Sequence, residues 1–382
     1  MKRQITPFGP FGSFGARWLA LPGMFIALVV ALASCGLPSN AITTATQTPK
    51  ATLPPGVFRP DFERGMAFPR WGQHVYGITD TSWTPDVQEM QGQTGAQWIE
   101  MTINLYQQTY TSTSVFAAAG TPSPDDVYIG ALSAREVGLH VFVEPILSVL
   151  GEPADPWGGR VHFSSAAQAQ RWFASYWATY RPYVVAAAQA GASQLSIGTE
   201  YDALENSFPD QWRWLLAQVR SVFSGPTTYA INHGSFAKPL PSWMTDPNLT
   251  YVGASMYRSL TNSPQQLTES QIEALWKQQV LPLLDALSRQ AGKPVVISEV
   301  GYRDSSDALF DPWIHQSSAP VDPQLQAAAY QAAVRASLGD PHIQGIFFWA
   351  WDNGIFSPDH QPAAQALHTL YLAPNPLTLS LS

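Results

Sequence analysis

The sequence predicts an α/β protein in which eight parallel strands and eight helices alternate to form a (β/α)8 barrel, or TIM barrel. Short apolar runs alternate with helical stretches over roughly 300 residues, and several of these runs are apolar without interruption. The length of 382 residues accommodates one such barrel. The main alternative, an open doubly wound sheet, is expected to carry a glycine-rich phosphate turn after its first strand. This sequence has no such turn.

The expected strands are short, and each interval between them leaves room for a helix. The clearest are Val141-Phe142-Val143 and Val295-Val296-Ile297, which are apolar at every position. Such runs are typical of strands in a parallel sheet that helices cover on both faces. The eight expected strands are residues 74–79, 97–104, 140–146, 194–199, 228–232, 251–256, 295–298 and 345–349.

Helical periodicity fills segments between the expected strands. One apolar stripe with a 3.6-residue period begins after Pro209 and ends before Gly225. A second covers residues 272–287, where Pro282 is expected to kink or split the helix because proline lacks a backbone N–H. A third, rich in alanine, covers residues 324–338. These helices supply the alternation that the barrel needs.

The first 34 residues resemble a secretory signal peptide. Basic residues, Lys2 and Arg3 among them, precede an apolar run at residues 18–33. Leu32-Ala33-Ser34-Cys35 resembles the bacterial lipobox, in which the cysteine is lipidated and becomes the first residue of the mature protein. An ordinary signal peptide with an incidental cysteine is the alternative. We expect an extracytoplasmic lipoprotein that is anchored at the bacterial cell surface through Cys35.

The chain after the signal divides into three expected parts. Residues 35–67 are expected to form a tether, because Thr, Pro, Ser and Ala dominate most of this stretch and bury too little apolar surface to offset their ordering entropy. Residues 68–376 are expected to form the single barrel domain, and residues 377–382 a short tail.

The composition favours a neutral, polar partner. Charged residues make up 13% of the chain and aromatic residues 12%, including 14 tryptophans. Many aromatic rings and few charges suit the flat face of a sugar. The formal net charge of −8, without a run of Lys or Arg, argues against nucleic acid. We expect a monomer that contacts the membrane only through its N-terminal lipid.

Several other chemistries lack their motifs in this sequence. The single cysteine excludes an internal disulfide and a cysteine-based zinc site. The eight histidines form no His-Glu-x-x-His motif, which argues against a metal site. There is no Gly-x-Ser-x-Gly elbow of a serine hydrolase and no phosphate loop. We expect neither a metal nor an organic cofactor.

Two glutamates follow expected strands directly. Glu200 comes after the fourth strand and Glu299 after the seventh. In a (β/α)8 barrel, active-site residues lie where strands end and loops begin, and these two strands lie on opposing sides of the mouth. Hydrolysis of a glycosidic bond needs such a pair. One acid protonates the leaving oxygen, while one carboxylate attacks the anomeric carbon or activates water.

Four segments carry a resemblance to a known family: Ile197-Gly198-Thr199-Glu200, Thr228-Tyr229-Ala230-Ile231-Asn232, Ser298-Glu299-Val300-Gly301-Tyr302 and Phe348-Trp349-Ala350-Trp351. The chain resembles glycoside hydrolase family 113, the β-1,4-mannanases, within the large clan of retaining enzymes. The resemblance implies that Glu200 is the acid/base and Glu299 the nucleophile of a covalent mechanism. Many clan members have Asn before the acid/base. Here Thr199 fits the Gly-x-Glu form of this family, which leaves the contact to the sugar 2-hydroxyl unassigned.

Aromatic residues near the strand ends are candidates for substrate binding. By the resemblance, Tyr257 donates a hydrogen bond to the nucleophile, and a core or rim position is the alternative. Trp349 and Trp351 alternate on the eighth strand and therefore face opposite ways. One of them is expected to lie beneath the sugar ring, with Trp349 preferred. Trp83 is a further stacking candidate, for which plain packing is the alternative.

Polar residues at the expected mouth complete the candidate site. Asn104 is expected to end the second strand, and Glu144 closes the third. Glu144 either binds a sugar hydroxyl or pairs with Arg303. Asn232 and His233 end the fifth strand, where a side chain can reach substrate.

Two loops near the expected mouth also contain residues of interest. Trp157 begins Trp157-Gly158-Gly159-Arg160, which resembles a family segment beside the cleft. Asp202 and Glu205 follow the acid/base closely and are expected in a solvated loop.

The expected function is hydrolysis of β-1,4-linked mannan or glucomannan with retention. One alternative keeps fold and mechanism but acts on β-glucan or galactan. Another is a non-catalytic carbohydrate-binding lipoprotein, which would need neither glutamate.

Overall fold

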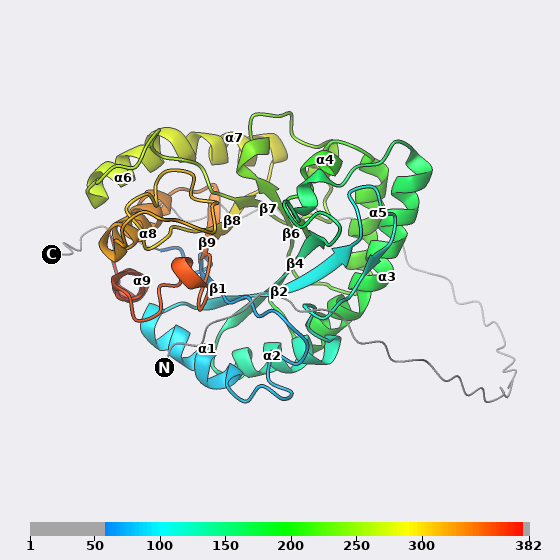
Figure 1. Ribbon diagram of the computed structural model, residues 1–382, viewed down its shortest axis with the longest axis horizontal. Helices are drawn as coiled ribbons and strands as arrows, with labels where there is room; N and C mark the ends of the chain where they lie inside the picture. Colours follow the sequence, from blue (N-terminus) through cyan, green and yellow to red (C-terminus); the bar gives the residue numbers. More distant parts are fainter. Residues whose placement is uncertain (1–57, 377–382) are drawn as a thin grey trace, which may run out of the picture. The chain divides into compact units, whose positions relative to one another are not determined.

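The computed structural model describes residues 58–376, which form a closed ring of eight parallel strands (Figure 1). β1 pairs with both β9 and β2, which closes the ring, and the two-residue β3 pairs antiparallel with the end of β2. The expected (β/α)8 barrel is confirmed. The strands are β1 (Glu63–Ala67), β2 (Trp98–Gln107), β3 (Val115–Phe116), β4 (His140–Val149), β5 (Gln194–Thr199), β6 (Thr227–Asn232), β7 (Val252–Ser255), β8 (Val295–Val300) and β9 (Ile343–Phe348).

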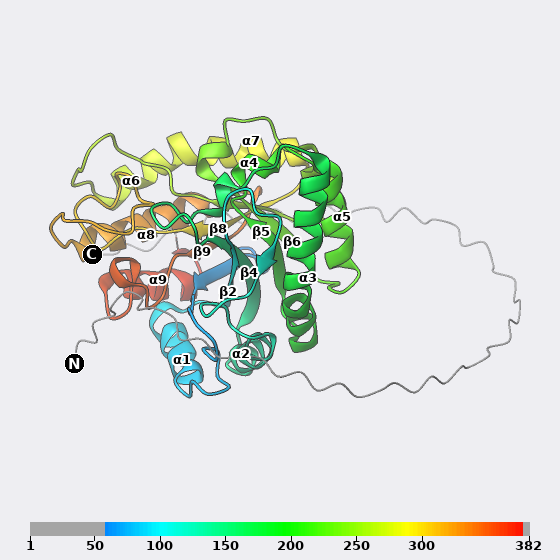
Figure 2. The same cartoon turned by 45° about the vertical axis from the view of Figure 1, so that its right-hand side comes forward.

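Helices surround the ring (Figure 2). Their starts carry recognisable sequence signals: Ser123 and Asp126 form a capping box at α2, and the Asp322 side chain caps α8. The helices are α1 (Trp83–Thr94), α2 (Pro124–Glu136), α3 (Ala166–Ala190), α4 (Asp202–Glu205), α5 (Pro209–Arg220), α6 (Glu269–Leu275), α7 (Leu281–Ala291), α8 (Pro323–Ser337) and α9 (Pro362–Leu372).

Pro282 divides the helical segment after β7, as the sequence predicts. α6 ends at Leu275, residues Trp276–Val280 form a π-helical turn, and α7 begins at Leu281 with Pro282 in its first turn. Proline supplies no N–H for an intrahelical bond. The first turn of a helix is the place where that loss costs least.

The first strand is not where the sequence analysis placed it. Within residues 74–79, His74 and Gly77 have positive φ angles of 63° and 110°, which a strand does not adopt. The strand is β1 instead, whose two charged residues hide its apolar pattern. Gly65 is needed there because a Cβ atom would lie 2.2 Å from the Phe347 ring. The barrel was expected to begin at residue 68, but its first strand ends at Ala67. This strand therefore lies within the range that was assigned to the tether.

β2 and β4 are longer than expected. They pair in parallel register over ten residues each, so that Gln107 lies opposite Val149 at their ends. Asn104 therefore lies inside β2 and Glu144 inside β4, which corrects the expectation that both close their strands. The extra residues of β4 extend one wall of the barrel beyond the shorter strands β5 to β9.

The barrel interior changes character along the strands. Phe142, Val296 and Phe347 pack together inside the ring. Because side chains alternate along a strand, Glu144 faces the same interior two residues after Phe142. Glu144 is buried, as is Glu100 on β2. An apolar layer is thus followed, toward the carboxyl ends of the strands, by a layer that contains two acids.

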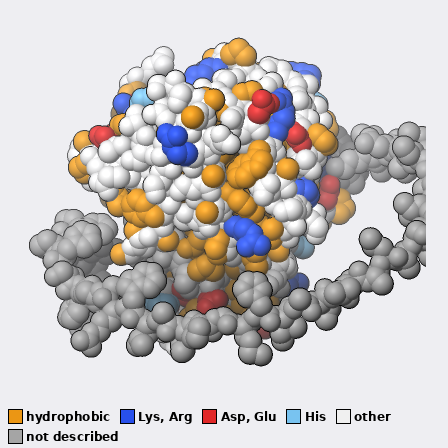
Figure 3. Space-filling model, turned by 90° about the vertical axis from the view of Figure 1, so that its right-hand side faces the viewer, with side chains coloured by type: hydrophobic (Ala, Val, Ile, Leu, Met, Phe, Trp, Pro, Cys, Tyr) orange, Lys and Arg blue, Asp and Glu red, His pale blue; other side chains and the backbone are white. Residues whose placement is uncertain are grey.

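One face of the molecule carries few charged side chains (Figure 3). The face that α3 and α5 cover in Figure 1 shows hydrophobic and uncharged groups with a few scattered charged side chains (Figure 3). Within residues 58–376, no helix combines the length and the apolar character needed to cross a membrane. Cys35 and the expected signal peptide lie outside the described residues.

Candidate active site

A cavity of about 570 Å³ opens where β4 to β8 end. Both strand-end glutamates, Glu200 and Glu299, line it. The other lining residues come from the end of β4 and its loop, from the ends of β6 and β7, and from the loop after β8. The cavity therefore lies at the carboxyl ends of the strands, where barrel enzymes place their chemistry.

Backbone geometry at the end of β5 positions Glu200. Its φ of 57° lies in the left-handed region, which costs a non-glycine residue about 1–2 kcal/mol. Two hydrogen bonds hold this conformation: the Glu200 N–H donates to the Ala230 carbonyl at 2.9 Å, and the Tyr201 N–H donates to the Tyr229 hydroxyl at 2.8 Å. Strained backbone of this kind is typical of functional residues that the surrounding structure holds in place.

The loop after β4 brings Trp157 to Glu200. Trp157 forms an antiparallel bridge with Ser148 at the extended end of β4, and its indole N–H donates to Glu200 Oε2 at 2.8 Å. Glycine is needed at two positions behind the ring. A Cβ atom on Gly158 would lie 2.8 Å from the Leu147 carbonyl oxygen, and one on Gly159 would lie 2.3 Å from the Trp157 ring. The segment that the sequence singled out therefore contacts Glu200 directly.

A β-bulge in β8 positions Glu299. The pairing of β8 with β9 shifts between Ile297 and Val300, and both of these residues pack in the outer core. An extra residue between two core positions redirects the side chains there, which turns Glu299 toward the cavity. Its Oε1 accepts a hydrogen bond of 2.5 Å from the Tyr257 hydroxyl. Tyr257 thus contacts the glutamate that the sequence analysis paired with it.

Burial raises the pKa of both Glu200 and Glu299. The charge of Glu200 adds to the rise at Glu299, whereas the Tyr257 hydroxyl opposes it. For Glu200, hydrogen bonding by Trp157 opposes the rise. Because the charge of Glu200 disfavours ionisation of Glu299, the pair holds one proton over a range of pH. Both shifts have the same direction, so pKa alone assigns no chemical role to either carboxyl.

Comparisons with known proteins identify this arrangement. Residues 73–371 match Glycoside Hydrolase Family 113. The chain belongs to this family. A comparison with curated protein sequences found no match.

Solved structures support the fold of this family 113 chain. A GH113 β-mannanase from Alicyclobacillus acidocaldarius in complex with ManMIm has a TM-score of 0.70 at 22% identity, with 82% of this chain and 98% of that chain covered. A complex of a GH113 β-1,4-mannanase has a TM-score of 0.69 at 20% identity, with 81% and 98% covered. A Ruminococcus gnavus β-glucuronidase has a TM-score of 0.54 at 14% identity, with 82% and 50% covered.

Other predicted residues of the family 113 chain also line the cavity. Asn232, the last residue of β6, and His233, which follows it, line the cavity. His233 stacks on Trp313 with ring centroids 5.1 Å apart. Sequence reasoning missed Trp313 and His315, which also line the cavity, because they lie in a loop without strand or helix periodicity.

Trp349 and Trp351 lie in different places. Trp349 packs with Tyr257 and Phe356 at the mouth, and its ring centroid is 6.4 Å from that of the exposed Trp71, another residue that sequence reasoning missed. Trp351 is buried in the outer core against Phe68 and is not available to a sugar. Trp349 is not among the residues that line the cavity, so its role beneath a sugar ring stays a prediction, whereas the candidacy of Trp351 is wrong.

Two further candidates do not reach the cavity. Trp83 is fully buried in α1, packs against Phe68 and donates its N–H to the Gly130 carbonyl. It is a core residue, and the stacking role is wrong. Asn104 bonds to Tyr106 and to Ser148, so it lies one residue behind the cavity lining.

Neither expectation for Glu144 holds. Arg303 is surrounded by backbone carbonyls of its own loop and pairs with Asp307 at 3.2 Å. Glu144 instead lies inside the barrel, where it interacts with Glu100. It is absent from the cavity lining.

Glu205 was expected in a solvated loop but is buried, where its carboxylate accepts from the Tyr229 hydroxyl at 3.1 Å. Burial raises its pKa to about 8. The expectation failed because Glu205 packs under buried aromatic residues: besides Tyr229, the Trp243 indole N–H donates to its backbone carbonyl at 2.8 Å. Asp202, by contrast, stays half-buried and bonds to Ser235.

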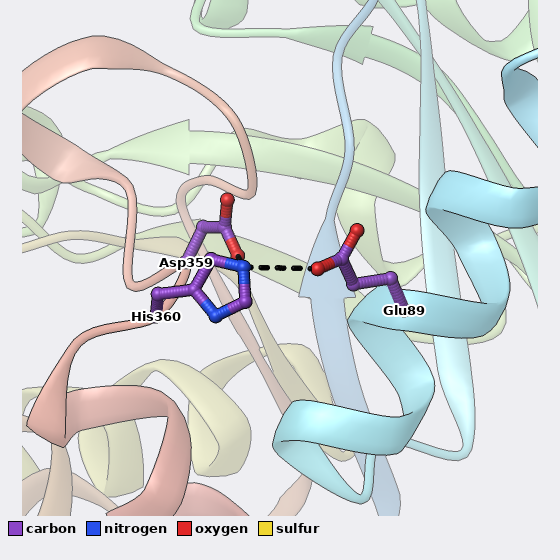
Figure 4. A group of neighbouring side chains, drawn as sticks. All are labelled: Glu89, Asp359 and His360. Atoms are coloured by element: carbon purple, nitrogen blue, oxygen red, sulfur yellow. Dashed lines mark ion pairs between the residues drawn. The ribbon is translucent and has the colours of Figure 1, made fainter.

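One group of three ligand-type side chains lies elsewhere among residues 58–376: Glu89, Asp359 and His360 (Figure 4). His360 Nε2 lies 3.0 Å from Glu89 and 3.7 Å from Asp359, and the imidazole is 73% exposed. An exposed ion pair explains this contact. None of the three residues lines the cavity.

Proposed function

We propose that this family 113 glycoside hydrolase cleaves β-1,4 bonds of mannan or glucomannan with retention of configuration. Glu200 is the acid/base and Glu299 the nucleophile. The observation that carries the proposal is the placement of two carboxyls, at the ends of β5 and β8, on one cavity of a family 113 barrel. These are the fourth and seventh strands of the eight-stranded ring.

The proposed reaction has two steps. In the first, a Glu299 oxygen attacks the anomeric carbon while Glu200 gives its proton to the leaving oxygen, so that a glycosyl ester forms and the glycosidic bond breaks. In the second, Glu200 takes a proton from water, and the oxygen of that water displaces Glu299 from the anomeric carbon. Each carboxyl returns to its starting protonation state.

Surrounding residues fit these roles. The Tyr257 hydroxyl orients Glu299 and stabilises its ionised form. Trp157 orients Glu200 through its N–H and presents its ring to the cavity. Trp157 and Trp313 offer the aromatic faces against which pyranose rings pack. Two solved relatives are a β-1,4-mannanase and a β-mannanase, which supports mannan as the first substrate to test.

The test is a reducing-sugar assay on mannan, glucomannan, β-glucan and galactan, with Glu299→Ala in parallel. We expect release of reducing ends from mannan or glucomannan, abolished in the variant. Activity confined to β-glucan or galactan would contradict the substrate while keeping the mechanism. Polysaccharide binding without any hydrolysis would contradict the enzymatic proposal.

We also propose that Cys35 carries the lipid anchor of an extracytoplasmic lipoprotein. The motif Leu32-Ala33-Ser34-Cys35 after an apolar run supports this. Metabolic labelling with a fatty acid, followed by detergent partition, tests it. We expect label and detergent-phase partition that Cys35→Ala loses. Retention of both in the variant would contradict the proposal.

A further inference from the structure

We propose that Glu100 and Glu144 share one proton inside the barrel, and that the charge remaining on Glu144 helps the pair Glu200 and Glu299 to keep its own proton. Glu144 would then be a positioning residue for acid catalysis, acting without touching substrate, and Glu100 would be the neutral donor to it. The link to catalysis rests on the proposed function, whereas the shared proton does not.

The two acids lie in the layer of the barrel interior beneath the cavity. Glu100 is 0% exposed and Glu144 1% exposed. Their strands are neighbours: Glu144 lies opposite Thr102, two residues after Glu100 on β2. Residues two apart on a strand point to the same side, so both carboxyls face the interior. The carboxyls interact directly with each other.

The surroundings of this pair are polar but carry no compensating cation among its strongest interactions. Both Glu100 oxygens and Glu144 Oε1 lack a hydrogen-bond donor. The groups acting most strongly on Glu144 are Glu100, Glu200 and the hydroxyls of Thr199 and Ser196. Those acting on Glu100 are Glu144 and Glu299. Two ionised carboxylates in contact without a cation are not stable in such an environment.

One shared proton resolves this conflict. A carboxyl O–H donates to the neighbouring carboxylate, which satisfies one oxygen on each side and leaves a single charge. Both Glu100 oxygens lack a donor, whereas only one oxygen of Glu144 does, so the proton belongs to Glu100 and the charge to Glu144. Burial raises the pKa of both.

The remaining charge acts on the catalytic pair. Glu144 interacts with Glu200, and it also raises the pKa of Glu299. A negative charge beneath two carboxyls that hold one proton makes that proton harder to lose. The other titratable groups that interact electrostatically with the two acids are tyrosines: Tyr180 of α3 and Tyr201 after β5 with Glu144, and Tyr257 after β7 with Glu100. Burial raises the pKa of all three, so they are neutral while the catalytic pair titrates.

Two Glu→Gln variants of the full-length protein provide a matched test. Glu144→Gln removes the charge, whereas Glu100→Gln replaces a neutral donor by another neutral donor. We expect the basic limb of the kcat/KM profile to move down by about one pH unit in Glu144→Gln. In Glu100→Gln it should stay within about 0.2 pH units of wild type. An unmoved limb in Glu144→Gln, or equal shifts in both variants, would overturn the proposal.

A second measurement needs neither activity nor the Glu144 variant. Infrared spectra in D2O at neutral pH report the carbonyl stretch of protonated carboxylic acids. The difference between wild type and Glu100→Gln should contain one such band, because Glu100 holds its proton. Absence of the band would overturn the shared proton, whatever substrate the enzyme hydrolyses. Presence of the band with no hydrolysis of any polysaccharide would keep the shared proton and contradict only the proposed function.

Discussion

The two glutamates of the cavity are held in different ways. Behind Glu200, Tyr201 packs into a buried aromatic cluster in which Trp212 and Trp243 stack with centroids 4.7 Å apart. Glu299 instead lies beside a smaller group at the mouth, where Tyr257, Trp349 and Phe356 meet. Glu200 is thus held by backbone hydrogen bonds and by the aromatic core behind it. Glu299 is held by the bulge in β8 and by the Tyr257 hydroxyl. Changes behind Glu200 should reduce stability together with activity, whereas changes around Glu299 should reduce activity alone.

The largest expected effect is on the nucleophile. Glu299→Ala should lower kcat on polysaccharide by at least about 10³-fold, because no other carboxylate replaces the attacking oxygen. Initial rates of reducing-sugar release measure this. Glu89→Ala, which changes an exposed acid outside the cavity, is the control and should keep wild-type rates. A loss of less than tenfold would contradict the role of Glu299.

The next effect depends on the leaving group. Glu200→Ala should lower kcat on polysaccharide by about 10²–10⁴-fold, because general acid catalysis is lost. The dinitrophenolate of a dinitrophenyl glycoside leaves without taking up a proton. Formation of the glycosyl-enzyme from that substrate should therefore be affected far less. The burst phase on that substrate measures the step. Equal losses on both substrates would contradict the acid role.

A pair of Tyr→Phe variants sharpens the comparison. Tyr257→Phe removes the donor to Glu299 and should lower kcat about a hundredfold with an unchanged melting temperature. Tyr229→Phe removes the acceptor for the Tyr201 N–H and the donor to buried Glu205, and should lower the free energy of unfolding by about 1–3 kcal/mol. Kinetics and thermal unfolding of both variants measure this. The reverse pattern would refute the proposed difference.

The smallest effect is a shift of pH profile. Trp157→Phe removes the N–H that lowers the pKa of Glu200, so that pKa should rise and the basic limb should move to higher pH. The expected shift is about half a pH unit, because a neutral donor acts more weakly than a charge. Trp214→Phe, on an exposed face of α5, is the control. A basic limb that moves down in Trp157→Phe would contradict the assigned contact.

The sequence predicted the fold and the two glutamates because both leave local patterns. Several buried parallel strands contain continuous apolar runs, and Glu200 and Glu299 each come at the end of an expected strand. β1 was not predicted because Gly65, in the middle of the strand, takes the place of an apolar side chain. Glycine is needed there to accommodate the Phe347 ring, which comes from a residue far away in the chain. The same limit explains Trp83 and Trp351, since an indole ring of the core and one of a sugar platform look alike in sequence.

The residues that contact Glu144 come from distant parts of the chain. The sequence predicted that Glu144 lies on a barrel strand. Whether it contacts Arg303, a sugar or another acid depends on the lengths of β2 and β4 and on the path of the loop after β8. Trp71 and Trp313 were missed for a related reason. They lie in loops whose paths are set by tertiary packing and leave no periodic pattern.

The most direct test of the retaining pair is covalent trapping. A 2-deoxy-2-fluoro-mannosyl fluoride slows the second step, so that the glycosyl ester accumulates and its peptide is found by mass spectrometry after proteolysis. We expect a single mannosyl adduct on the peptide that contains Glu299, and faster loss of the adduct when an acceptor sugar is added. An adduct on Glu200, or turnover of the reagent to a product of inverted configuration, would contradict the account.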